Sequence, residues 1–188
     1  MKLNIDIKKE QEIAQEDIKK QGCRVLVCGG TGCVANGSMS VMDKFRELGA
    51  DVSVATSYDK LTVIPTGCHG FCEQGVLVLL PDLHTAYVKV KVEDVEEIYN
   101  SHIVGGKPVE RLLYVDPATK QSVQRPEEIN FYAKQTRTAL KNCGHINAES
   151  IDEAIAVGTY EALAKVLSEE DQEAVIKEIE DSGLRGRG

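Results

Sequence analysis

The chain has no tryptophan, and tyrosine and phenylalanine together supply only nine aromatic residues among 188. Proteins that bind single-stranded nucleic acids stack the bases on aromatic side chains, so this composition disfavours that class. Long apolar runs are lacking as well, because the longest is the five-residue stretch 76–80. A membrane-spanning helix needs about 20 apolar residues. We therefore expect no direct membrane insertion.

Basic residues are also few. Lysine and arginine number 22 against 30 aspartates and glutamates, which gives a formal net charge of −8. The phosphates of nucleic acids demand a basic face, and the sequence shows no stripe rich in lysine and arginine. The N-terminus offers no secretion signal. The sequence thus predicts a cytoplasmic protein that has no nucleic-acid partner.

Four of the six cysteines stand in two glycine-bordered loops. The first loop is Cys28-Gly-Gly-Thr-Gly-Cys33 and the second is Cys68-His-Gly-Phe-Cys72, with 34 residues between them. Each spacing lets one turn aim two sulfurs at a shared centre, and glycine permits a close backbone approach with N–H groups pointing at sulfur. An iron–sulfur cluster held by thiolates is anionic, so it suits loops rich in N–H donors. The two loops predict a metal or iron–sulfur site.

Other uses of these cysteines remain alternatives at this point. A structural zinc site also takes four thiolates, and the second loop fits its usual ligand spacing. A thioredoxin-like redox dithiol normally has the spacing C-x-x-C, which this sequence lacks. Structural disulfides need an oxidising compartment, which the missing secretion signal disfavours. An iron–sulfur site is the preferred interpretation.

The two remaining cysteines and two loop residues have other predicted roles. Cys23 is separated from Cys28 by a strand-like run, and an odd separation along a strand places two side chains on opposite faces. We expect Cys23 to be a core thiol and Cys143 to be a turn or helix-end residue with no partner nearby. His69 suggests a Rieske-type ligand, but four cysteines complete the set, so a surface or supporting histidine is preferred. Phe71 is expected to shield the centre from water.

The cysteine loops carry a resemblance to a known family. Cys28-Gly-Gly-Thr-Gly-Cys33, then Thr66-Gly-Cys68-His-Gly-Phe-Cys72-Glu, then an apolar strand ending at Pro81 and a segment containing Tyr87 resemble the thioredoxin-like [2Fe–2S] ferredoxins. That family includes the small iron–sulfur subunit of NADH dehydrogenase complexes. The resemblance covers about residues 22–115. It implies that Cys28, Cys33, Cys68 and Cys72 ligate a [2Fe–2S] cluster.

The pattern of apolar and polar residues predicts an α/β arrangement over the same region. A solvated helix is expected over residues 8–21 and a buried strand over 24–27. The sequence then predicts a helix capped by Ser38 and running to residue 48, a parallel strand over 51–56, and an extended segment from residue 60 to 64. A hairpin and a final helix complete the unit, with strands at 76–80 and 86–90 and the helix at 92–102. This is a thioredoxin-like order, and it places the cysteine loops at strand ends.

Beyond this unit the chain changes character. Residues 108–128 hold three of the five prolines and one apolar patch, so we expect a linker that lies across a neighbour. Residues 129–188 predict a small group of short helices. Their expected positions are 136–142, a helix opened by the capping box at Ser150, 160–167, and one that follows an N-cap at 168–171. We thus divide the chain into an N-terminal helix (1–21), a thioredoxin-like [2Fe–2S] domain (22–107), a linker (108–128) and a helical segment (129–188).

The helical segment carries a second resemblance. Asn142-Cys143-Gly144, the run from Ser150 to residue 165, and Ser182-Gly-Leu-Arg-Gly-Arg-Gly188 resemble the start of the flavin-bearing, NADH-oxidising subunit family. In that family the last run continues into a glycine-rich loop that binds FMN. The first residues of such a loop would here be Gly186, Arg187 and Gly188. Backbone N–H groups at such glycines can approach a phosphate.

A chain that carries both resemblances is similar to the β subunits of NAD-dependent, electron-bifurcating [FeFe] hydrogenases and of related formate dehydrogenases. The fusion implies an N-terminal piece of a subunit that binds FMN and NAD(H) in a multi-subunit redox complex. The piece itself would then carry single electrons. NADH:quinone oxidoreductase is a further context for the same module. A zinc-stabilised binding module and a thiol oxidoreductase that uses Cys68 and Cys72 remain the rival functions.

Overall fold

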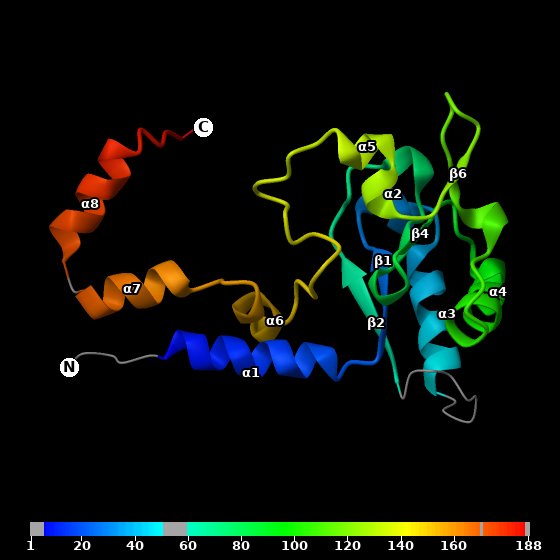
Figure 1. Ribbon diagram of the computed structural model, residues 1–188, viewed down its shortest axis with the longest axis horizontal. Coiled ribbons are helices and arrows are strands. Elements are labelled where there is room, and N and C mark those ends of the chain that lie inside the picture. The colour runs from blue at the N-terminus through cyan, green and yellow to red at the C-terminus, as the bar shows by residue number, and fades with distance from the viewer. Residues whose placement is uncertain (1–5, 51–59, 170, 187–188) are drawn as a thin grey trace.

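The computed structural model describes residues 6–50, 60–169 and 171–186. Its centre is a four-stranded sheet with the strand order β2-β1-β3-β4 (Figure 1). Strands β1 and β2 are parallel, whereas β3 is antiparallel to both β1 and β4. The strands span Cys23–Cys28 (β1), Leu61–Thr66 (β2), Val78–Leu80 (β3) and Thr85–Tyr87 (β4).

Strand β1 is buried along its whole length because both faces of the sheet are covered. Successive side chains of a strand point to opposite faces, so Val25 and Val27 enter one apolar core while Leu26 and Cys28 enter another. Cys23 is fully buried in the first core, which confirms the prediction of a core thiol on the face opposite Cys28. The cysteine at the end of β1 therefore starts its loop from the most protected strand.

Helix α3 (Ser38–Ala50) covers the first core with Val41, Met42 and Phe45. The predicted helix was right, but Ser38 is its first residue rather than its cap, and its hydroxyl is buried without a hydrogen-bond partner. The predicted strand 51–56 lies outside the described residues. The extended segment expected from residue 60 is strand β2, which runs on to Thr66.

The predicted hairpin and the helix that follows it are both present. Strands β3 and β4 pair around Pro81, though each is shorter than expected. Residues 92–104 form one continuous helical segment of three kinds: a 3-10 turn, the α-helical turn α4 (Val95–Glu97) and the π-helix Ile98–Val104. Val95 and Ile98 pack into the first core, which ties this segment to the same face as α3.

The segment expected as a linker packs closely against the sheet. Val109, Leu112 and Leu113 belong to the first core, and the backbone N–H of Val109 donates to the Tyr87 hydroxyl at 3.0 Å. The short strands β5 (Tyr114–Val115) and β6 (Ser122–Val123) then form a separate hairpin. The apolar patch in this segment is thus part of the core of the sheet unit.

The chain next follows α5 (Asn130–Ala133) and a run of turns that leads to α6 (Ile151–Ala156). The helix predicted over 136–142 was wrong, because those residues form turns. An isolated short helix is costly to nucleate, and the two threonines in this stretch are weak helix formers. Ser150 caps α6 as predicted, since its side chain accepts from the backbone N–H of Glu153 at 3.3 Å, but the capping box is incomplete because the Ser150 N–H donates to the Asn147 carbonyl instead of to Glu153.

Helix α1 (Ile7–Lys19) lies beside α6 (Figure 1), which confirms the expected N-terminal helix resting on a neighbour. Ala14 and Ala156 are buried, and the Gln15 side chain donates to the Ala156 carbonyl at 2.9 Å. A buried ion pair lies close by, because Arg24 of β1 meets Glu153 of α6 at 2.8 Å. These contacts fasten α6 to the sheet unit.

Helices α7 (Glu161–Glu169) and α8 (Gln172–Asp181) extend away from the sheet (Figure 1). Both match predicted positions, and α8 is capped by the Asp171 side chain, which accepts from the Ala174 N–H at 3.0 Å. Their large apolar side chains are exposed: Leu163, Leu167, Ile176 and Ile179. None of the helices in the described ranges is both long and apolar enough to cross a bilayer.

Candidate metal centre

The first cysteine loop directly follows β1, the most buried strand. Cys28 ends β1, and Cys33 follows in the short helix α2 (Thr31–Ala35); both side chains are buried. The backbone is held on two sides, because the N–H of Cys28 donates to the Leu77 carbonyl and the N–H of Gly29 to the Thr66 carbonyl at 2.7 Å. The first loop is therefore fixed to the sheet by backbone hydrogen bonds.

The second cysteine loop follows the edge strand β2, and its two cysteines are exposed. The sulfurs of Cys68 and Cys72 lie 3.7 Å apart. Two sulfurs bound tetrahedrally to one metal at ~2.3 Å lie about 3.8 Å apart, so this pair already has the separation that one metal ion requires. The N–H of Gly70 points at the Cys68 sulfur at 3.4 Å, and this glycine has the positive φ of 76° that the turn needs.

Glycines hold open the space between the two pairs. A Cβ added to Gly30 would lie 3.2 Å from the Cys68 sulfur, and one added to Gly75 would lie 2.7 Å from the Cys33 sulfur. A side chain at either glycine would thus crowd a cysteine of the site. Cys28 is close enough to Cys33 to raise the pKa of its thiol, so each loop supplies a pair of neighbouring thiols.

This arrangement fits a centre with two metal ions. Within the described ranges, no three cysteine, histidine, aspartate or glutamate side chains gather tightly enough around one point to hold a single ion. A [2Fe–2S] cluster takes four thiolates, two on each iron. Two facing pairs with glycine between them match that requirement. The residues present therefore fit the cluster.

Burial and mutual proximity set the protonation of the free thiols. Burial raises the pKa of the Cys33 thiol to about 12, with the neighbouring Cys28 thiol adding to the effect. The pKa of Cys72 is also raised, first by its hydrogen bond with Cys68. Cys33 and Cys72 therefore carry protons at neutral pH in the metal-free chain, and binding a metal must release them.

Aromatic side chains cover the second loop from outside. Phe71 is buried, as expected of a shield, and its ring stacks on Phe131 with the centroids 4.5 Å apart. Tyr132 meets the edge of Phe71 at 5.5 Å. Phe131 and Tyr132 come from α5, and the sequence analysis did not identify them. The only available signal was their position as adjacent aromatics in a chain that has few.

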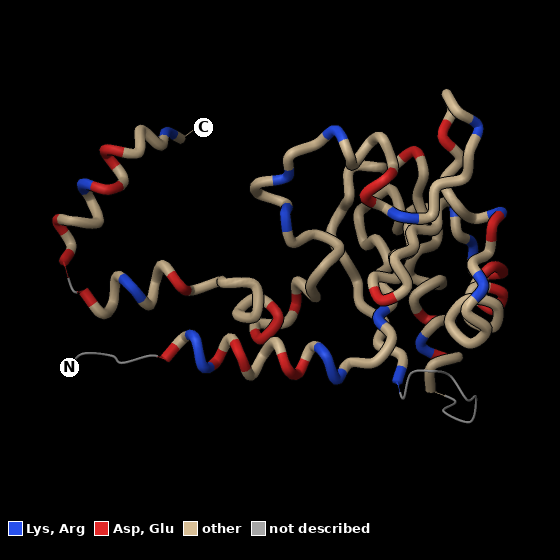
Figure 2. The backbone as a smooth tube through the Cα atoms, in the orientation of Figure 1, with Lys and Arg blue, Asp and Glu red and all other residues tan. Residues whose placement is uncertain are grey.

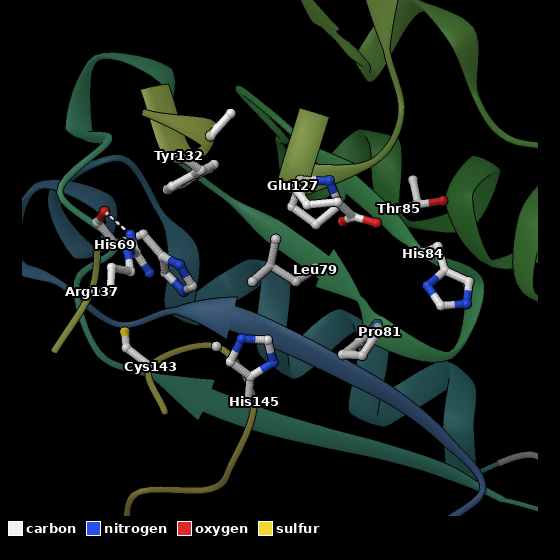
Figure 3. A pocket seen from close by; sticks show the side chains of 13 residues that line it. His69, Leu79, Pro81, His84, Thr85, Glu127, Tyr132, Arg137, Cys143 and His145 are labelled. Carbon is white, nitrogen blue, oxygen red and sulfur yellow. Dashed lines mark hydrogen bonds between the residues drawn. The ribbon is translucent and has the colours of Figure 1, made fainter. Parts of the chain in front are cut away.

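The turn around Cys143 lies against the second loop (Figure 3). The Cys143 sulfur is 3.7 Å from the Cys68 carbonyl oxygen and 3.8 Å from the Thr66 hydroxyl, so the expectation of no partner nearby was wrong. The backbone N–H of Gly144 donates to the same hydroxyl at 3.1 Å. Gly144 adopts a positive φ of 84°, which lets the chain turn back over the loop.

His69 is buried behind the second loop rather than placed on the surface. Burial lowers its pKa to about 4, with the positive charges of Arg137 and His145 adding to the effect, so the ring is neutral at pH 7. Arg137 donates to the His69 carbonyl at 2.9 Å (Figure 3). The ring lines a cavity of about 510 Å³ between the sheet unit and residues 126–145.

Of the residues predicted to open a flavin loop, only Gly186 belongs to the described part of the chain. Gly186 lies near the C-terminal end, and a Cβ built on it meets no atom within 4 Å. Arg187 and Gly188 lie outside the described residues. The structure thus brings together the four cysteines of the sequence prediction, while the flavin-loop residues stay a prediction.

Comparison with known proteins agrees with the geometry. The family described as thioredoxin-like [2Fe-2S] ferredoxin matches residues 13–102. A 2Fe-2S ferredoxin of Aquifex aeolicus is 42% identical over 83 residues, which cover 43% of this chain and 71% of that protein. A solved thioredoxin-like [2Fe-2S] ferredoxin from the same organism aligns with a TM-score of 0.42 at 33% identity, covering 48% of this chain and 87% of that one.

A further match extends to a much larger protein. The NADP-reducing hydrogenase subunit HndC of Solidesulfovibrio fructosivorans is 54% identical over 55 residues, which are 29% of this chain and 11% of that subunit. The chain therefore matches only about a tenth of that relative. The cysteine loops, the α/β fold with its helical C-terminal segment and the ferredoxin match lead to one assignment. The chain belongs to the thioredoxin-like [2Fe–2S] ferredoxin family.

Proposed function

We propose that Cys28, Cys33, Cys68 and Cys72 ligate one [2Fe–2S] cluster and that the chain is a one-electron carrier. The observation that carries this proposal is the pair of facing cysteine loops, with the Cys68 and Cys72 sulfurs 3.7 Å apart and glycines between the walls. The ferredoxin-family match supports the same cofactor.

The residues of the chain have separate tasks in this function. When bound, the cluster takes up and gives back one electron. Cys28 and Cys33 fix one end of the site in the core, while the exposed Cys68 and Cys72 mark the end nearest to solvent, where electrons are exchanged. The Gly70 N–H stabilises negative charge on the Cys68 sulfur. Phe71 and Phe131 exclude water from one side of that end.

In the intact protein, this chain is the N-terminal part of a cytoplasmic subunit of a multi-subunit hydrogenase that uses a nicotinamide cofactor. The match to the HndC subunit supports this context. FMN and NAD(H) then bind beyond this segment, with Gly186, Arg187 and Gly188 opening the FMN loop. We keep the domain division after residues 21, 107 and 128 as part of this proposal, with residues 108–128 as a connecting segment whose apolar residues pack into the core of the sheet unit. Bound FMN would supply hydride exchange with the nicotinamide there, and Cys28, Cys33, Cys68 and Cys72 would hold the cluster that serves single-electron exchange with a partner subunit, as in electron-bifurcating hydrogenases or related formate dehydrogenases.

Low-temperature EPR spectroscopy on anaerobically purified protein tests the electron-carrier function. We expect no signal before reduction and a rhombic S = 1/2 signal after addition of dithionite, because one electron makes the coupled iron pair paramagnetic. Integration of the signal should approach one spin per chain. Protein that binds zinc, contains no iron and gives no signal would overturn the proposal and leave a structural module.

A further inference from the structure

One of the stretches of this acidic chain that lack acidic residues contacts the second cysteine loop. Residues 129–148 contain no aspartate or glutamate, although the whole chain has 30, and they carry Lys134, Arg137 and Lys141. Lys134 and Lys141 are exposed, and so is the large apolar side chain of Leu140 between them. Figure 2 shows the basic positions of the loop between α5 and α6 with no acidic position among them. This basic loop, residues 134–141, is a local exception to the net charge of −8.

The basic loop lies beside the exposed end of the candidate cluster site. Arg137 donates to the carbonyl of His69, which follows Cys68 directly, at 2.9 Å. The flanking segments also contact the second cysteine loop, through the stacking of Phe131 on Phe71 and through the Cys143 sulfur at 3.7 Å from the Cys68 carbonyl. The loop is therefore anchored at three points around the two exposed cysteines.

The position of the charge is fixed rather than diffuse. The Arg137 guanidinium lies 4.9 Å from the centroid of the Tyr132 ring, which holds the side chain over the loop. Glu127, which precedes α5, lines the same cavity as Arg137, so one carboxylate lies near the basic loop. Charges within about 10 Å act on a docking partner at ordinary salt concentrations. A partner that approaches Cys68 and Cys72 thus meets the positive charges of the basic loop.

We propose that the basic loop, together with the exposed Cys68 and Cys72, is the docking surface for a redox protein whose own electron-transfer site is surrounded by aspartate and glutamate side chains. This inference rests on the proposed cluster. The acidic remainder of the chain repels such a partner, whereas the basic loop attracts it, and this contrast orients the encounter. One electron passes from the reduced cluster to the oxidised centre of the partner, with no bond made or broken.

Stopped-flow oxidation of the dithionite-free, reduced protein by oxidised rubredoxin, a small acidic iron protein, tests the proposal. Both proteins carry net negative charge, so repulsion between whole molecules makes the rate rise with added salt. Attraction at the basic loop makes it fall, and this fall is the result we expect. Hexaamminecobalt(III), a cation, serves as the comparison oxidant. Its reaction with the reduced protein should not slow when the positive charges of the basic loop are removed.

Two variants with equal charge changes sharpen the test. The triple change Lys134→Gln, Arg137→Gln, Lys141→Gln should slow the reaction with rubredoxin roughly tenfold at low salt, because the steering charge is gone. The control changes Lys8→Gln, Lys165→Gln, Lys177→Gln on α1, α7 and α8 should have a much smaller effect. Circular dichroism and EPR spectra must match the unmodified protein in both variants.

Two results would overturn the docking surface: a rubredoxin rate that rises with salt in the unmodified protein, or equal slowing by both triple variants. A failure of the cluster itself is distinguishable from these. If the chain held no cluster, reduction by dithionite would not bleach the visible absorbance. This is seen before any oxidant is added, and it would contradict the proposed function.

Discussion

The two cysteine loops each supply two thiols, but they are built into the molecule in different ways. The first follows the central strand β1, and Cys28 and Cys33 are buried in the core. The second follows the edge strand β2, and Cys68 and Cys72 are exposed and are covered only in part by later segments. In the proposed function, the buried loop would therefore anchor the cluster and the exposed loop would be the side at which electrons are exchanged.

The largest expected effect comes from removing one ligand from each loop. Cys33→Ser should abolish cluster assembly, because it loses a buried thiolate and leaves a hydroxyl in an apolar site, at a cost of about 1–3 kcal/mol. Cys68→Ser should retain part of the cluster with an altered spectrum, since an exposed serine oxygen is hydrated and can move. Iron per chain and visible absorbance measure both outcomes.

Cys143→Ser is the matched control for this comparison, because Cys143 touches the second loop without belonging to the quartet. It should keep full iron content. Equal iron loss in the Cys33 and Cys68 variants would remove the distinction between anchoring and exchanging loops, and iron loss in the Cys143 variant would show that the quartet is wrongly assigned.

Glycine substitutions test the space between the loops. Gly75→Ala should strongly reduce iron content, because the added Cβ would lie 2.7 Å from the Cys33 sulfur of the first loop. Gly32→Ala is the control, since its Cβ would meet the Cys72 sulfur at an ordinary contact distance of 4.0 Å. Iron and sulfide analysis of both variants checks the expectation. Full iron content in the Gly75 variant would mean that the cluster does not occupy this space.

The buried ion pair between β1 and α6 should have a moderate effect. Glu153 pairs with Arg24 at 2.8 Å and also accepts from the Asn147 N–H at 2.7 Å, which holds the turn containing Cys143 in place. Glu153→Ala leaves the arginine buried and unpaired, so we expect a loss of about 3 kcal/mol in the free energy of unfolding by urea.

The same variant should make the Cys143 thiol react faster with iodoacetamide, because its turn is no longer held against the second loop. Glu149→Ala, at an exposed position four residues earlier, is the control and should change stability by less than about 0.5 kcal/mol. Equal stability of the two variants would refute the role assigned to the ion pair.

The smallest expected effect concerns the aromatic cover. Phe131→Ala should admit water to the second loop and raise the reduction potential, because water stabilises the extra negative charge of the reduced cluster. We expect a shift below about 59 mV, which corresponds to a tenfold change in a one-electron equilibrium. An EPR-monitored redox titration measures it. Tyr160→Ala, which removes an exposed aromatic ring, should leave the potential unchanged; a lowered potential for Phe131→Ala would contradict the shielding role.

Sequence reasoning was most successful where the signal was local. The spacing of the cysteines, the glycines between them and the alternation along β1 predicted which thiols face each other and why Cys23 does not join them. The capping serine at Ser150 was likewise correct, since the residues that make the cap are three positions apart.

Long-range contacts were the part that the sequence did not reveal. Cys143 reaches Cys68 across 75 positions, and Phe131 reaches Phe71 across 60, so no periodicity connects them. The helix expected over 136–142 does not form. Arg137 in this stretch is held by a hydrogen bond to the second loop, and the backbone makes turns instead of the hydrogen bonds of an α-helix. The absence of acidic residues from 129–148 did not identify this stretch either, because residues 18–42 also lack them.

Mössbauer spectroscopy of protein grown on ⁵⁷Fe tests the central claim most directly, because it reports every iron atom in the sample. We predict that all iron in the oxidised protein is ferric, tetrahedrally coordinated by sulfur and diamagnetic at low temperature, at two atoms per chain. Reduction by one electron should convert half of it to the ferrous state. One isolated iron per chain, or iron that is not spin-coupled, would contradict a [2Fe–2S] cluster held by the two cysteine loops.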